Sequence, residues 1–133
     1  MALLTRARII GLTVALMMLA ACLSSEAIAQ RPESFDRAVE AQMAKNYVEA
    51  ARLYRIGANK GYAPSQNELG LLYLLGHGVP LDHVEAYKWF LLASRSQSDR
   101  DTANYNRGRA ATKMTSEQIR EAENRSKEWK PER

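Results

Sequence analysis

The chain has 133 residues, of which 19 are Lys or Arg and 15 are Asp or Glu, so its net charge at pH 7 is +4. This basic surplus is modest and its charges are interspersed, which argues against nucleic acid as a partner. A single cysteine excludes a disulfide within the chain, so helix packing must hold a domain of this size together.

The first segment has the pattern of a secretory signal. Two arginines precede the uncharged apolar run 9–23, which is too short to span a bilayer comfortably as a permanent helix. Small residues then occupy the two positions that a signal peptidase reads, with cleavage after Ala29. The pattern predicts a signal peptide at 1–29 and one mature domain at 30–133, with 17 Lys and Arg against 14 Asp and Glu.

A second interpretation of the same segment stays open. Leu19-Ala20-Ala21-Cys22 looks like a bacterial lipobox, so the signal would be 1–21 and Cys22 would carry the acyl anchor. The membrane is a partner only in that case; otherwise Cys22 is discarded with the peptide. Both interpretations predict an exported protein of the periplasm or cell envelope.

From residue 33 onward the pattern is helical, without an alternating run long enough for a strand. Four polar residues precede apolar-periodic segments and are expected to cap helices: Asn46, Asp82, Ser98 and Thr115. The predicted helices are about 33–44, 46–59, 64–75, 82–95, 98–112 and 115–129. Because the joins are short, neighbouring helices should be antiparallel, in hairpins at about 33–59, 64–95 and 98–129.

The chain also repeats itself. A shift of 36 residues places Ala50 on Ala86 and Tyr54 on Phe90, so the two segments have small and large residues in the same order. Small residues such as Gly70 permit close approach of two helices, and large ones fill the space around the contact. Such a unit cannot bury its apolar face alone, which predicts stacked copies. Trp129 is expected to close the end of the stack.

The middle hairpin carries three motifs: Leu69-Gly70-x-x-Tyr73, Gly76-x-Gly78-Val79-x-x-Asp82 and Ala86-x-x-Trp89-Phe90-x-x-Ala93. These motifs resemble Sel-one-like repeats, relatives of the tetratricopeptide repeat, and the resemblance spans nearly all of 33–131. It implies an all-α fold, a short right-handed α-solenoid of about three antiparallel helix pairs. It also implies a non-enzymatic adaptor or scaffold that binds another protein or a peptide segment.

The alternative function comes from disulfide-rich exported relatives, some of which are linked to binding or hydrolysing β-lactams. On that interpretation the chain is a cell-wall or β-lactam-related small-ligand binder or hydrolase. Residues 30–133 contain no cysteine, which weakens this carry-over. A cluster of nucleophile, base and oxyanion donor is also not evident in the sequence.

In this family the first helix of each pair lines the concave face, where a partner would bind. The candidate residues on that face are Phe35, Val39, Gln42, Asn67, Leu71, Leu74, Arg100, Ala103 and Arg107. A groove that is apolar at one end and basic at the other would suit an extended or helical peptide with an acidic flank. The alternative is that half of these side chains pack between hairpins.

Other polar groups give no sign of a catalytic, metal or cofactor site, and none is predicted. His77 and His83 flank the glycine loop, and Asp82 is the one obvious third ligand for a metal. We interpret His77 as a variable loop residue and His83 as part of the first turn of the next helix. The serines between the second and third hairpins are expected to form a polar connection. The alternating charges of 117–128 are expected to form a solvated face.

Overall fold

Six α-helices and no strands make up residues 31–133, the part of the chain that the computed structural model describes. The helices are α2 (Glu33–Met43), α3 (Tyr47–Asn59), α4 (Ala63–Leu75), α5 (His83–Ala93), α6 (Arg100–Ala111) and α7 (Ser116–Glu128). No helix in this part is both long and apolar enough to cross a membrane. The predicted signal peptide 1–29, its lipoprotein alternative 1–21 and Cys22 lie outside the described residues.

The predicted helix boundaries agree with the structure to within about two residues, and three of the four predicted caps form. The Asn46 and Asp82 side chains each accept a hydrogen bond from the backbone N–H three residues on. Thr115 and Gln118 form a complete capping box at the start of α7. Gly76 ends α4 in the left-handed conformation, with φ of +68°.

The predicted cap at Ser98 is wrong. Helix α6 begins at Arg100, its N-cap residue is Asp99, and no side chain caps its first turn. The Ser98 hydroxyl instead donates to Asp99 Oδ2 at 2.6 Å, and the Ser96 hydroxyl donates to the same oxygen at 3.2 Å. The serines and Asp99 therefore bond to one another in the turn between α5 and α6.

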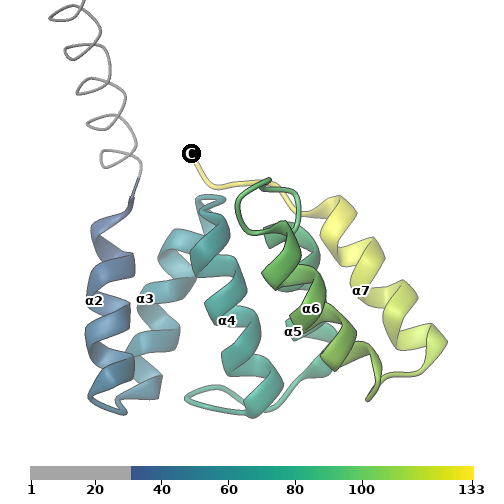
Figure 1. Ribbon diagram of the computed structural model, residues 1–133, viewed down its shortest axis with the longest axis horizontal. Coiled ribbons are helices and arrows are strands. Elements are labelled where there is room, and N and C mark those ends of the chain that lie inside the picture. The colour runs from purple at the N-terminus through teal and green to yellow at the C-terminus, as the bar shows by residue number, and fades with distance from the viewer. Residues whose placement is uncertain (1–30) are drawn as a thin grey trace, which may run out of the picture. The chain divides into compact units, whose positions relative to one another are not determined.

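The helices follow one another in three successive pairs and form an all-α helical-repeat solenoid, as predicted. Figure 1 shows them side by side in chain order, with α6 in front of α5. Helix α4 packs against both α3 and α5, and α5 then packs against α6. We call the surface formed by the first helices of the three pairs, α2, α4 and α6, the first-helix face.

The third pair is splayed. Helix α7 packs on α5, as α6 does, whereas contact between α6 and α7 is marginal. The buried residues of α6 are the small or polar Ala103, Asn106 and Ala110, so this helix offers little apolar surface to a second neighbour. The Arg125 guanidinium bridges Glu121 and Glu85, reaching the Glu85 carboxylate on α5 at 3.2 Å.

The prediction that Trp129 closes the end of the stack is wrong. Its indole instead meets Trp89 of α5 edge-to-face at 6.3 Å between ring centroids and packs on the core cluster shared by α2 to α5. Beyond it the chain returns to the end of α3, where Glu132 N–H donates to Asn59 O at 2.8 Å. Asn59 Nδ2 donates to Glu132 Oε1, also at 2.8 Å. The C-terminal segment thus covers the turn between α3 and α4.

Replacing Gly70 with Ala tests the close approach of α4 and α5. An added Cβ would lie 2.6 Å from Phe90 Cε1, and the Phe90 side chain is fully buried, so it cannot move aside freely. We expect Gly70→Ala to lower the free energy of unfolding by about 1–3 kcal/mol. Urea denaturation followed by circular dichroism measures this change.

Gly108, in α6, provides the matched control, because nothing lies within 4 Å of its added Cβ. Gly108→Ala should stabilise the protein by about 0.5–1 kcal/mol through helix propensity alone. If the two substitutions shift the denaturation midpoint in the same direction, the close approach at Gly70 is not a constraint on the fold.

Replacing Trp129 with Ala tests the returning C-terminal segment. The change removes a ring contact to Trp89 and an indole that lies over the Gly61 turn, so we expect a loss of about 3 kcal/mol. Lys130→Ala, at the exposed next residue, should change stability by less than about 0.5 kcal/mol. Thermal melts compare the two, and equal melting temperatures would show that the segment does not stabilise the fold.

Candidate functional site

A hollow of about 240 Å³ lies between α2 and α4, with Tyr54 of α3 among the residues that line it. Its lining residues are Phe35, Val39, Gln42, Met43, Tyr54 and Glu68. The Tyr54 side chain is buried beneath it, with the Phe35 ring 5.7 Å away between centroids. Met43 is 80% exposed, which leaves an apolar side chain open to solvent beside the hollow. The hollow therefore combines apolar walls with two polar side chains.

Glu68 is the distinctive group of this hollow. It is the only Asp, Glu, Lys or Arg between Lys60 and Asp82, and α4 is otherwise built of apolar and neutral residues. Its carboxylate oxygen Oε2 accepts a long hydrogen bond, 3.5 Å, from Gln42 Nε2. Burial raises the pKa of the Glu68 carboxyl above its usual value, and the Gln42 bond offsets this effect only in part.

Two further polar groups belong to side chains that line the hollow. Gln42 Oε1 is buried and has no hydrogen-bond partner among residues 31–133, so it is closed off from the open space of the hollow and carries a free-energy penalty. Burial, and secondarily the charge of Glu68, raise the pKa of Tyr54 above its ordinary value. Glu68 is therefore the charged side chain among the lining residues.

The predicted concave-face residues have different environments. Phe35, Val39 and Gln42 come together at the hollow. Asn67 is buried, and its Oδ1 accepts a 3.0 Å hydrogen bond from Asn106 Nδ2 of α6, so it joins two first helices. Its neighbours along α4 pack into the second core cluster, where Leu74 is buried and Leu71 is half-buried.

The candidates on α6 also differ from one another. Arg100 is exposed and Ala103 is fully buried. Arg107 is half-buried, with its guanidinium carbon 5.9 Å from the centroid of the Tyr87 ring, a cation–π arrangement. This contact joins the Arg107 side chain of α6 to α5, and the role of Arg107 in binding stays a prediction.

Sequence reasoning missed three lining residues: Met43, Tyr54 and Glu68. The repeat pattern marks Tyr54 as a large residue beside a close helix contact, which does not reveal that it also lines a hollow. For Glu68 a signal existed, because one acid stands alone in an uncharged stretch of the sequence. Such an isolated charge on a buried helix points to a functional or structural partner.

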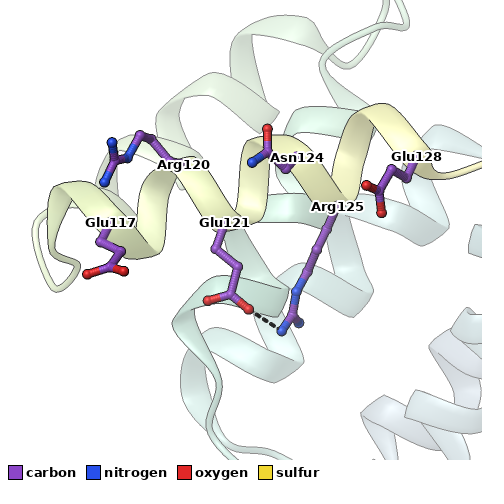
Figure 2. A pocket seen from close by; sticks show the side chains of 6 residues that line it. All are labelled: Glu117, Arg120, Glu121, Asn124, Arg125 and Glu128. Atoms are coloured by element: carbon purple, nitrogen blue, oxygen red, sulfur yellow. Dashed lines mark hydrogen bonds and ion pairs between the residues drawn. The ribbon is translucent and has the colours of Figure 1, made fainter.

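A second depression runs along α7, but its side chains do not converge. Figure 2 shows Glu117, Arg120, Glu121, Asn124, Arg125 and Glu128 spread along one helix, with the Glu121–Arg125 ion pair dashed. All six are exposed, which agrees with the predicted solvated face. Arg125 in addition ties α7 to Glu85, so part of this face holds the splayed helix in place.

The glycine loop between α4 and α5 is a packing element. The His77 ring stacks on the Tyr47 ring at 4.6 Å between centroids. A Cβ at Gly78 would lie 2.1 Å from Tyr47 O, so the loop rests directly on the start of α3. Within residues 31–133 no group of three His, Cys, Asp or Glu side chains could hold a metal ion.

Comparisons with known proteins agree with this architecture. A model of the Sel1 repeat matches residues 41–62 and 63–98. The chain is also similar to the crystal structure of a protective antigen present in uropathogenic Escherichia coli strains, which displays an SLR fold. The identity is 29% and the TM-score is 0.67, over 72% of this chain and 21% of that one, so this chain spans about a fifth of its length. No curated protein matches the chain.

The burial of Glu68 predicts a pH-dependent stability. Its pKa in the fold lies above the ordinary value of 4.5, so the unfolded carboxyl releases its proton at lower pH than the folded one. Stability is therefore fully present below pH 4.5 and falls as the pH rises through the folded pKa. Urea denaturation at a series of pH values measures this effect as the difference between wild type and Glu68→Gln.

The two proteins should converge in stability at low pH, and wild type should become the less stable one as the pH rises. Glu40→Gln, on the exposed side of α2, is the matched control and should not reproduce the trend. A pH-independent difference between wild type and Glu68→Gln would contradict the raised pKa.

Proposed function

The chain carries Sel1 repeats, and we propose that it is a non-enzymatic interaction module that binds a peptide or protein segment on its first-helix face. Sel1 repeats generally mediate protein–protein interaction, which supports this class of function. The observation that carries the proposal is the hollow between α2 and α4, with its apolar walls, the half-buried Glu68 and the exposed Met43 beside it.

The first-helix face offers anchors of different kinds to such a segment. The hollow accepts a side chain between the apolar Phe35 and Val39, while Arg107 presents a positive charge on α6. An extended or helical segment could contact both, since repeat proteins bind ligands along the row of first helices. An acidic residue of the segment would pair with Arg107.

The proposal includes a location. The pattern of residues 1–29 predicts export, so the partner would be a protein of the periplasm or cell envelope. Anchoring to the membrane through Cys22 would restrict the partner to one reachable from the membrane surface.

Site-directed photocrosslinking in cells tests the proposal. A photoreactive amino acid at Met43, beside the hollow, should trap one protein partner that mass spectrometry then identifies. The same amino acid at Asn124, on the exposed face of α7, is the matched control and should trap nothing specific.

Gln42→Ala and Arg107→Ala should each reduce capture from Met43 by about tenfold while the helical melting curve stays unchanged. Asn67 is unsuited to this test, because its side chain is buried against Asn106. Capture that is equal from Met43 and Asn124, or that persists in both variants, would overturn a binding site on the first-helix face.

A further inference from the structure

We propose that the hollow between α2, α3 and α4 receives a basic side chain, Lys or Arg, of the bound segment, with Glu68 as its ion partner. This inference rests on the proposed function and adds the chemistry of the ligand. It follows from three features: a half-buried carboxylate with a weak partner, apolar walls that suit the stem of a basic side chain, and the acidic charge of α2.

Glu68 forms no ion pair within residues 31–133, and its hydrogen bond from Gln42 is long. A half-buried carboxylate loses hydration, and a 3.5 Å bond from a neutral amide restores little of it. Burial accordingly raises the pKa of this carboxyl. A cation that enters the hollow would interact with Glu68 in a medium of low dielectric, where the attraction is stronger than at an open surface.

The Glu68 carboxylate has room for further hydrogen-bond donors. It accepts the 3.5 Å bond from Gln42 Nε2, and a carboxylate can accept several more. A Lys ammonium brings three N–H donors and an Arg guanidinium brings five, with no acceptors. An acidic or purely apolar side chain would bring no charged donor to this carboxylate.

The walls of the hollow suit the stem of a basic side chain. Phe35 and Val39 line one side, and the exposed Met43 extends the apolar surface outward. Lys and Arg bury their methylene stems along apolar surface and place the charged head at a polar site. The hollow has this combination, with an apolar wall on α2 and the carboxylate of Glu68 on α4.

The helix that forms this wall is acidic. Within α2, Glu33, Asp36 and Glu40 stand against the single basic residue Arg37. Like charges spread along one helix produce a field that attracts cations to its vicinity. The basic Arg107 lies on α6, so the first-helix face is acidic near α2 and basic near α6. A ligand that is basic at one end and acidic at the other would bind in one direction.

A random dodecapeptide library displayed on phage, selected on the immobilised full chain, tests the inference. We expect the recovered peptides to share one Lys or Arg position. Fluorescence anisotropy then measures a recovered peptide and its norleucine variant at that position, on wild type and on Glu68→Gln. The norleucine variant should bind wild type at least about tenfold more weakly than the parent peptide and should show little loss on Glu68→Gln.

Glu117→Gln removes the same charge from the exposed face of α7 and is the matched control. It should weaken the parent peptide by less than about twofold. Peptides that bind the first-helix face without a shared basic residue, or whose affinity does not change in Glu68→Gln, would overturn this inference and leave the proposed function standing. Recovery of no peptide at all would overturn both.

Discussion

The described fold depends on how closely α4 approaches α5. At Gly70 the missing side chain leaves room for the fully buried Phe90 ring, so the two helices lock at short distance. That contact fixes the rotation of α4, and the three preceding residues then each meet a different environment. Leu69 enters the core shared with α3, Glu68 reaches the hollow beside α2, and Asn67 bonds to α6. One turn of helix thereby joins the repeats and presents the candidate site.

Helix α5 is the common support of the C-terminal part. Both α6 and α7 pack on it, and its Glu85 carboxylate holds Arg125 of the splayed α7. The chain after α7 then returns to Trp89 and Asn59 rather than extending the stack. Repeat units bury their apolar surface against neighbouring segments. Here the Trp129 indole and the segment after it cover part of the middle repeat.

The sequence predicts well those features that depend on residues close together in the chain, such as helix caps. The helix starts at Asn46 and Thr115 are predictable, because each cap needs only one side chain and a backbone N–H three residues further along the chain. The sequence does not predict contacts that depend on how several helices are placed relative to one another. The return of Trp129 depends on the splay of α7, and the burial of Asn67 depends on the position of Asn106, 39 residues further on. Glu68 lies between these cases: its isolation is visible in the sequence, but the hollow around it requires α2 and α3.

A short solenoid with a small hollow offers limited surface for a partner, so selectivity must come from a few anchors and not from area. A half-buried charge is effective for this purpose, because a ligand that fails to pair with it pays the penalty for leaving it unsatisfied. Glu68 would therefore discriminate between ligands more strongly than it would raise the affinity for the best one. The Asn67–Asn106 bond contributes indirectly, since it holds α6 and its Arg107 beside α4. The spacing between acidic and basic anchors is thus set by the buried contacts of α4, and substitutions in that core would change selectivity without touching the ligand.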